Sequence, residues 1–296
     1  MEPDPLDSTL NRRQFLAASG AIALTASPIR GVLSDDEEDS RSRATGELTV
    51  KRLSWAGIQL TAGATTLCVD PVITPSALGA QWKDPVVPIE VPTDRRYVLV
   101  THLHNDHFDP PTVAKIIEKS GLVGCHHEHG EYLASRGVKV RALGTYEPYI
   151  LGDFTVCPVL AVDAFNDFQI SWVISGGGKR VIHCGDTLWH GNWWRVGRLY
   201  GPFDAAFLPI NGANILEHET PSLLPATMTP EQAVAAAVIL GAKLIVPIHY
   251  GYNEPGVYEE YPRAHEILLE TARKRGVGVE TLKGGEWMNW KSNRDA

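Results

Sequence analysis

The sequence predicts an α/β protein in which two β-sheets pack face to face with helices outside them, a four-layer αββα sandwich. Short segments of apolar and β-branched residues, each closed by Gly, Pro or Asp, crowd the first half of the chain. After residue 110, helix signals alternate with further strand signals, and no repeat recurs at a fixed period. Each predicted strand or helix has an apolar face to bury. A single domain with two stacked sheets between outer helices buries all of these apolar faces.

The first half of the folded region is predicted to be mainly strands. A loop between residues 70 and 95 interrupts them, because its five prolines exclude a long helix or a central strand. A helix is expected from Pro110, with Val113, Ile116 and Ile117 on one face. Strands are expected at residues 48–53, 57–62, 65–69, 97–101, 122–125, 138–142, 149–151, 154–156, 169–175 and 180–183.

The second half contains clearer helix boundaries. Thr229, Pro230 and Gln232 form a capping signature, with Thr as the N-cap, Pro at the first helical position and Gln at the third. The Ala-rich helix that follows is expected over 231–240 and ends at Gly241. A strand at 243–248, a helix at 263–275 and two strands at 278–282 and 286–290 complete the prediction.

The N-terminal residues 1–33 are interpreted as an export signal. Arg12 and Arg13, followed by Phe15 and Leu16, resemble the Arg-Arg-x-Phe-Leu pattern of twin-arginine signals, and a weakly apolar run follows. That run of about 14 residues is short for a spanning helix, which needs ~20. An ordinary amphipathic or disordered tail is the alternative. The resemblance implies export from the cytoplasm, to the periplasm or beyond, with the export machinery as a partner.

A charged segment separates this signal from the folded region. Residues 34–47 carry no apolar periodicity and are expected to be an acidic, disordered linker, so that a single folded domain spans residues 48–296. The net charge of −8 and pI of about 5.8 argue against a nucleic-acid partner, which would require clustered Lys and Arg. The four cysteines form no CxxC pair and are expected to be small buried hydrophobes.

One short loop concentrates metal-ligand residues. An apolar strand that ends near Thr101 leads directly into His102, His104, Asp106 and His107. Imidazole and carboxylate are donors that zinc, iron and manganese accept, provided that they converge. Because residues two apart can point one way while the next pair points another, the spacing predicts two cations about 3.5–4 Å apart.

Two distant segments supply further ligand-type residues, again directly after predicted strands. Asp186 follows the strand at 180–183 in "VIHCGDTLW", and a carboxylate with two oxygens can bridge two cations. His249 follows the strand at 243–248 in "LIVPIHYGYNE". Three separate strands therefore end in residues of this kind.

These motifs resemble those of the metallo-β-lactamase superfamily, with its His-x-His-x-Asp-His motif, its Gly-Asp-Thr bridging motif and its late strand-end His. The segments "THLHNDHFD", "HCGDT", "MTPEQA" and "VPIHYG" are most similar to the branch that contains ascorbate-phosphate lactonases and N-acyl-phosphatidylethanolamine phospholipase D enzymes. The resemblance extends from about Leu48 to Trp290. It implies the αββα fold and a metal-dependent hydrolase that acts on a phosphodiester, lactone or ester in a small molecule or lipid.

Position by position, the resemblance implies two metal ions, expected to be Zn²⁺ with Mn²⁺ or Fe²⁺ as alternatives. It places His102 and His104 on the first, Asp106, His107 and His249 on the second, and Asp186 between them. The family's further His is absent from residues 156–172. Asp163 lies closest to the expected place and is the candidate substitute, because Asp binds zinc at ~2.0–2.2 Å. His183 is the reserve candidate.

The resemblance also implies a mechanism. His104 occupies a position where redox di-iron members carry Glu, which favours hydrolysis over oxygen chemistry. Asp106 is the expected catalytic residue, because it would both ligate and orient a water whose pKa two cations lower toward ~7.

Other polar and aromatic residues have two interpretations each. Trp189, His190 and Trp193 follow the bridging Asp and could form a substrate-binding wall with Asn211, or could pack a short helix onto the sheet. The "CHHEHG" segment, with His126, His127 and His129, is expected to be a strand-to-helix turn rather than a second metal site.

Two rivals to the enzyme remain at this level. A non-catalytic metal-binding or scaffold protein would explain the His-to-Asp departure as a degenerate site. A membrane-associated phospholipase would need an exposed apolar patch, and the sequence contains no amphipathic helix that indicates such a patch.

Overall fold

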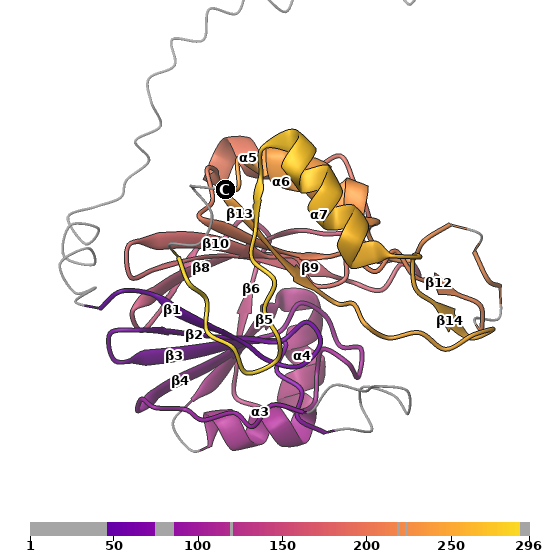
Figure 1. The fold of residues 1–296 in the computed structure, drawn as a ribbon. Helices are drawn as coiled ribbons and strands as arrows, with labels where there is room; N and C mark the ends of the chain where they lie inside the picture. The colour runs from indigo at the N-terminus through magenta and orange to yellow at the C-terminus, as the bar shows by residue number, and fades with distance from the viewer. Residues whose placement is uncertain (1–45, 75–85, 119–120, 218–219, 223, 291–296) are drawn as a thin grey trace, which may run out of the picture. The chain divides into compact units, whose positions relative to one another are not determined.

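Two β-sheets stacked face to face form the centre of the protein, with helices on both outer surfaces (Figure 1). The computed structural model describes residues 46–74, 86–118, 121–217, 220–222 and 224–290. The predicted signal and the predicted linker as far as residue 45 lie outside the described residues. Leu48, the residue from which the folded region was predicted to extend, is buried in the core.

The first sheet has six strands in the order β1-β2-β3-β4-β5-β6. Neighbours pair antiparallel from β1 to β3 and parallel from β3 to β6. The strands are β1 (Thr49–Arg52), β2 (Ile58–Ala62), β3 (Thr65–Val69), β4 (Arg95–Leu99), β5 (Leu122–His126) and β6 (Val140–Leu143).

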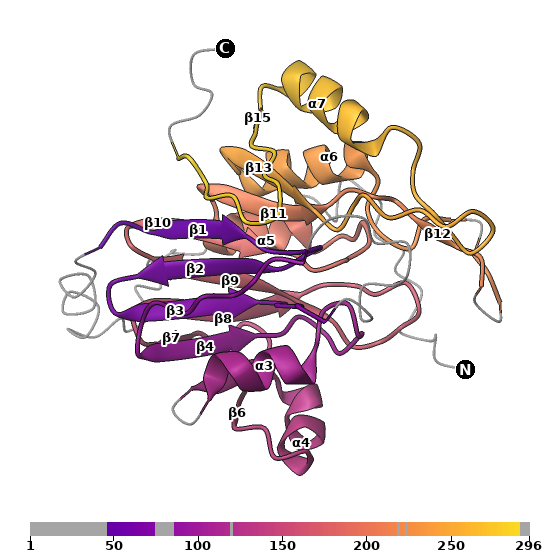
Figure 2. The same ribbon diagram turned by 60° about the horizontal axis from the view of Figure 1, so that its bottom comes forward.

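The second sheet has seven strands in the order β15-β13-β11-β10-β9-β8-β7. Strands β10, β11, β13 and β15 are parallel, while β7, β8, β9 and β10 pair antiparallel. Its strands are β7 (Tyr149–Leu151), β8 (Phe154–Leu160), β9 (Ile170–Gly176), β10 (Lys179–His183), β11 (Ala205–Pro209), β13 (Leu244–Ile248) and β15 (Gly278–Val279). A separate two-stranded ribbon pairs β12 (Asn214–Ile215) with β14 (Tyr258–Glu259) and extends away from both sheets (Figures 1 and 2).

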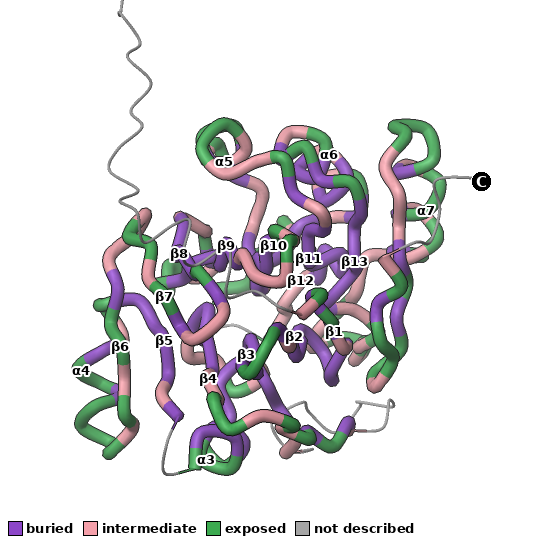
Figure 3. The backbone as a smooth tube through the Cα atoms, turned by 90° about the vertical axis from the view of Figure 1, so that its left-hand side faces the viewer, coloured by how far each residue is buried: buried purple, intermediate pink, exposed green. Residues whose placement is uncertain are grey.

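The helices divide between the two outer faces. Helices α3 (Pro110–Ile117) and α4 (His127–Ser135) cover the first sheet, and α5 (Trp193–Tyr200), α6 (Pro230–Leu240) and α7 (Ala264–Arg275) cover the second (Figure 2). Three buried apolar clusters fill the spaces between successive layers, and the strands are accordingly the most buried part of the chain (Figure 3). The four-layer αββα sandwich is therefore confirmed.

Helix α6 shows how local sequence determines a boundary. The Thr229 hydroxyl accepts from the backbone N–H of Gln232, and the Gln232 side chain accepts from the backbone N–H of Thr229. The helix ends at Gly241, whose φ of 66° is in the left-handed region that favours glycine. Both ends agree with the prediction.

Two sequence-based assignments are corrected. Strand β11 was not predicted, although the apolar run from Ala205 to Ile210 lies between the polar residues Asp204 and Asn211. The segment predicted as a strand at 286–290 forms no regular strand, although it bridges Lys51 through Trp287 and exchanges backbone hydrogen bonds with Arg52 and Val50 of β1. No helix among the described ranges is long and apolar enough to span a membrane.

Candidate metal centre

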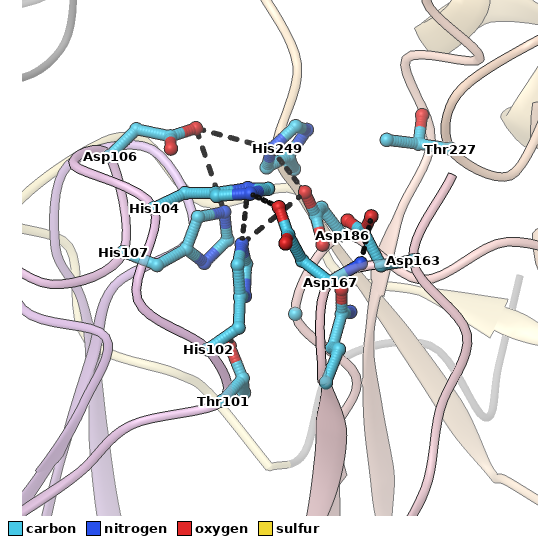
Figure 4. Close-up of polar contacts among 12 residues, drawn as sticks. Thr101, His102, His104, Asp106, His107, Asp163, Asp167, Asp186, Thr227 and His249 are labelled. Carbon is cyan, nitrogen blue, oxygen red and sulfur yellow. Dashed lines mark hydrogen bonds and ion pairs between the residues drawn. The ribbon is translucent and has the colours of Figure 1, made fainter. Parts of the chain in front are cut away.

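The candidate ligands follow strands that run in one direction. In the first sheet β3 and β4 are parallel, and in the second β8, β10, β11 and β13 share a direction. Ligands in open α/β sheets bind beyond the carboxyl ends of the strands. The loops that leave these six strands carry Asp70, His102 to His107, Asp163, Asp186, Asn211 and His249. Figure 4 shows that most of these side chains meet at one point between the sheets.

The backbone bends sharply where it delivers several of these groups. Trp55, Asp70 and His249 have φ values of 54°, 44° and 55°, in a region that costs non-glycine residues energy. Gly185, directly before Asp186, has a φ of 60°, and a Cβ there would lie 2.9 Å from the Thr101 hydroxyl. Strained backbone at these turns directs side chains toward the centre.

An inner group of ligands consists of Asp106, His107 and His249. The Nε2 atoms of His107 and His249 each lie 3.6 Å from Oδ2 of Asp106. Two atoms bound to one tetrahedral zinc ion at 2.0–2.1 Å are separated by about 3.4 Å. The indole N–H of Trp55 donates to the same Asp106 oxygen at 2.9 Å, and its ring packs on His249 at 4.1 Å. The inner group therefore has a geometry suited to one cation.

An outer group consists of His104, Asp163 and Asp186, whose ligand atoms all lie within 4.8 Å of one another. His102 joins the two groups: its Nε2 lies 2.9 Å from His104 Nδ1 and 3.6 Å from Asp186 Oδ2. His102, His107 and Asp186 form a third convergent set between the other two. Asp163, the candidate substitute for the missing His, is therefore one member of a convergent group.

The ligand atoms themselves test whether metal ions fit. Nε2 of His107, Nε2 of His249 and Oδ1 of Asp186 are buried and have no hydrogen-bond partner among the described residues. Buried polar atoms without partners are costly, and most proteins satisfy nearly all of them. All three atoms belong to residues of the convergent groups, and their imidazole and carboxylate chemistry is the kind that divalent metals prefer, so the site fits a metal centre.

Buried partners orient the inner imidazoles. His107 Nδ1 lies 2.9 Å from Oδ2 of Asp70, a carboxylate that is itself fully buried. Asp70 also accepts from the hydroxyl of Thr101 at 2.6 Å and from its backbone N–H at 2.8 Å, and that hydroxyl lies 3.0 Å from His102 Nδ1. A carboxylate behind a ligating imidazole fixes the ring and its tautomer, leaving Nε2 free for a metal.

An exposed partner orients the outer imidazole. His104 Nε2 lies 2.9 Å from Oδ2 of Asp167, so that its Nδ1 faces the centre (Figure 4). The Asp167 side chain is 64% exposed, in contrast to the buried Asp70. One oxygen of Asp163 accepts from the backbone N–H groups of Phe165 and Asp167 at 2.6 and 3.2 Å, which folds the loop around the carboxylate.

The electrostatics of the centre are dominated by pairing between carboxylates and imidazoles. Burial alone would raise the pKa of Asp186, but the nearby imidazoles of His102, His107 and His249 hold it below its ordinary value. Burial opposes the charged form of His107 as well, yet Asp106 and Asp70 together raise its pKa to about 9. Burial, with help from Asp186, raises the pKa of Asp163. Imidazoles rather than lysines or arginines thus provide the positive partners of these carboxylates.

The predicted substrate-binding residues are mostly buried elsewhere. Trp193 is 1% exposed in the core between the second sheet and its helices, and its ring stacks on His190 at 4.2 Å. Trp189 packs against the same core and contacts the edge of Trp194. The alternative, in which these residues pack a short helix, α5, therefore holds for Trp193 and His190, which are buried. Trp189 is only partly buried, and its place in a substrate-binding wall stays a prediction.

Asn211 also has a different place from the one expected. It is fully buried, and its Oδ1 accepts from the Thr227 hydroxyl at 2.5 Å and lies 3.3 Å from His249 Nδ1. Its side-chain nitrogen donates to the Tyr258 hydroxyl. Asn211 thus supports His249 from behind instead of facing open space.

Local hydrogen bonds account for His183 and His126. His183 donates from Nε2 to the Ala56 carbonyl at 2.7 Å and accepts at Nδ1 from the Gly185 N–H, so it has no nitrogen left for a metal. His126 ends β5 and caps α4, and its Nε2 lies 2.9 Å from the Thr145 hydroxyl. In the part of the chain that the structure describes, His126, His127 and His129 belong to no group of convergent ligands.

Sequence reasoning missed Asp70 and Asp167, which support the ligands without belonging to a motif. Asp70 follows the predicted strand 65–69 directly, as Asp186 and His249 follow theirs, so its position was a usable signal. Asp167 lies in a loop with no such signal. Only the packing of that loop against His104 identifies it.

The comparisons with known proteins agree with this geometry. Residues 65–250 match the family described as the beta-lactamase superfamily domain. The chain is 30% identical over 245 residues to a UPF0173 metal-dependent hydrolase of Thermus thermophilus, a similarity that covers 80% of this chain and 96% of that protein.

Two solved structures share the fold. Igni18, a metallo hydrolase from Ignicoccus hospitalis, superimposes with a TM-score of 0.63 at 22% identity, covering 81% of this chain and 97% of that one. CmlA, a diiron beta-hydroxylase from Streptomyces venezuelae, gives a TM-score of 0.63 at 18% identity, covering 82% and 54%. One fold therefore carries different chemistries, and the donor set has to decide between them. By its sequence match and its convergent strand-end ligands, this chain belongs to the UPF0173 metal-dependent hydrolase family of the metallo-β-lactamase superfamily.

Proposed function

We propose that the protein is a hydrolase that uses two divalent cations. Asp106, His107 and His249 would hold one, and His102, His104 and Asp163 the other, with Asp186 shared. The single observation that carries this proposal is the convergence of these side chains in overlapping groups with buried, unpaired ligand atoms. Each cation would have two imidazoles, one carboxylate of its own and the shared carboxylate, a mixture that suits Zn²⁺, Mn²⁺ or Fe²⁺.

A bound pair of divalent cations supplies a water of lowered pKa and polarises the bond to be cleaved. The chain's own groups supply orientation. Asp106 Oδ2 is held by the Trp55 indole and lies against both inner imidazoles, which leaves Oδ1 to accept a hydrogen bond from a water. Asp70 and Asn211 hold the inner imidazoles, and Asp167 holds the outer one.

The charge of the centre favours a neutral substrate. Three carboxylates belong to the candidate ligand set, because Asp163 takes the place where the resemblance implies a histidine, and Asp167 adds a fourth nearby. Two divalent cations with three carboxylates and a hydroxide sum to zero charge, so an anionic phosphodiester would gain little attraction. We therefore infer that the substrate is a lactone or another carboxylic ester of a small molecule, in preference to a phosphodiester.

A substrate screen tests the proposal. The protein is assayed with a lactone, p-nitrophenyl acetate and bis-p-nitrophenyl phosphate after loading with zinc or manganese, with His102→Ala and Asp186→Ala as blanks. We expect metal-dependent turnover of the two carbonyl compounds that both substitutions remove. Turnover that survives both substitutions, or two equivalents of bound metal with no hydrolysis of any probe, would contradict it and favour the non-catalytic metal-binding protein.

We also propose export through the twin-arginine pathway, which rests on Arg12, Arg13, Phe15 and Leu16 alone. Replacing both arginines with lysine in a fusion to a reporter that is active only after export is expected to abolish the signal. Unchanged export would show that the segment has another role.

A further inference from the structure

The two-stranded ribbon brings one more polar group toward the candidate centre. Tyr258 lies on β14, and its largely buried hydroxyl accepts a hydrogen bond from the side-chain nitrogen of Asn211. Its ring meets Tyr252 edge-on at 5.2 Å, and Tyr252 in turn meets the edge of Trp55 at 6.4 Å, which donates to Asp106. A continuous aromatic path thus connects the inner group to Tyr258.

The hydrogen-bond network determines which way the Tyr258 proton points. Nε2 of His249 belongs to the inner group and must keep its lone pair to ligate, so Nδ1 carries the proton and donates to Oδ1 of Asn211. The Thr227 hydroxyl donates to that same oxygen. The amide nitrogen of Asn211 therefore faces Tyr258 and donates to its oxygen, which leaves the Tyr258 proton to be given to another acceptor.

The surroundings keep this hydroxyl a neutral donor. Burial, followed by the carboxylates of Asp106 and Asp186, raises the pKa of Tyr258 well above 10. The Asn211 amide joins this hydroxyl to Nδ1 of His249, so Tyr258 lies next to the side chains that surround the inner group. A fixed neutral donor in a water-poor site stabilises developing negative charge more strongly than water does.

On the basis of the proposed function, we propose that Tyr258 is a catalytic residue whose hydroxyl donates a hydrogen bond to a substrate oxygen that gains negative charge during hydrolysis. The proton stays on Tyr258 throughout, so the step is electrostatic and no bond to the hydroxyl forms or breaks. Asn211 then has a double task, because the same amide orients His249 through one end and Tyr258 through the other.

The test is Tyr258→Phe, which keeps the ring against Tyr252 and removes only the hydroxyl. The matched control is Tyr261→Phe, because that hydroxyl contacts Glu231 on α6 at 3.5 Å, away from the centre. With p-nitrophenyl acetate we expect kcat to fall about 10²-fold in Tyr258→Phe, while KM and bound metal stay unchanged and the control behaves like the parent. An unchanged kcat, or a parallel loss of bound metal that signals a merely structural role, would overturn the proposal.

A second readout is independent of turnover. Cobalt replaces the native metal, and inorganic phosphate, an oxyanion, is titrated while the visible spectrum is followed. Tyr258→Phe is expected to weaken phosphate binding about tenfold without changing the spectrum of the phosphate-free protein. If the parent hydrolyses none of the probes but this weakening is found, the proposed function fails and Tyr258 as a donor stands; equal phosphate affinity overturns Tyr258 alone.

Discussion

The inner and outer ligand groups contain similar side chains but are supported in different ways. In the inner group, His107 and His249 are buried and are held by Asp70 and Asn211, which are fully buried themselves. In the outer group, the His104 side chain is 36% exposed, and its partner Asp167 is mostly in solvent. The inner group is therefore buried in the core, whereas the outer group lies partly at the protein surface.

Similar ligands therefore need not bind metal with equal affinity. A buried carboxylate in a low-dielectric surrounding restrains and polarises an imidazole more than a hydrated one, because solvent screens the exposed pair. We expect the inner group to be filled first and to hold its cation more tightly. The outer group would then set the metal concentration at which the full site forms.

The largest expected effect comes from removing one imidazole from either group. His107→Ala takes a ligand from the inner set and from the set that joins the groups, so we expect both cations to be lost and hydrolysis to fall more than about 100-fold. His104→Ala should lose only the outer cation. Metal analysis of the dialysed variants measures how many equivalents each one keeps. Retention of one equivalent of metal by His107→Ala would contradict the expected loss of both cations.

Stepwise metal loading measures the affinities of the two groups directly. Calorimetric titration of the metal-free protein with zinc should show two binding events whose dissociation constants differ by about 10–100-fold. Activity should follow the weaker event, because both cations are needed. A single event of two equivalents would show that the exposed support is as effective as the buried one.

The supporting carboxylates give a smaller, paired effect. Asp70→Asn should weaken the inner event and lower the free energy of unfolding of the metal-free protein by about 1–3 kcal/mol, because a buried acceptor of three hydrogen bonds is altered. Asp167→Asn should weaken only the outer event, about tenfold, with no change in stability. Denaturant unfolding and the same zinc titration, applied to both variants, distinguish the two effects. A loss of stability in Asp167→Asn would contradict the expected difference between the buried and the exposed carboxylate.

The smallest effect is expected at Asp163, where the motif resemblance implied a histidine. Asp163→His replaces one zinc ligand type with another, so we expect hydrolysis within about tenfold of the parent and a preference shifted from manganese toward zinc. Asp163→Ala, the matched control, should lose the outer cation. If Asp163→Ala keeps two equivalents of metal, Asp163 is not a ligand and the outer group is incomplete.

Much of the site could be predicted from sequence, because each strand end carries its own local signal. An apolar run followed by His102, Asp186 or His249 marks a polar side chain at a sheet edge regardless of what surrounds it. The same rule would have found Asp70 and Asn211, the second of which was missed as a support because β11 before it was not recognised. Asp167 and Tyr258 follow no such pattern.

The sequence by itself determined the layer order, the capped boundaries of α6 and the ligand types, because hydrophobic periodicity, capping and strand-end chemistry act within a few residues. The packing of distant segments determines which ligands share a group, that Trp193 and Asn211 are buried, and that Asn211 links Tyr258 to His249. These outcomes depend on how loops from two sheets and the β12–β14 ribbon pack together, and contacts between segments so far apart in the chain leave no local pattern.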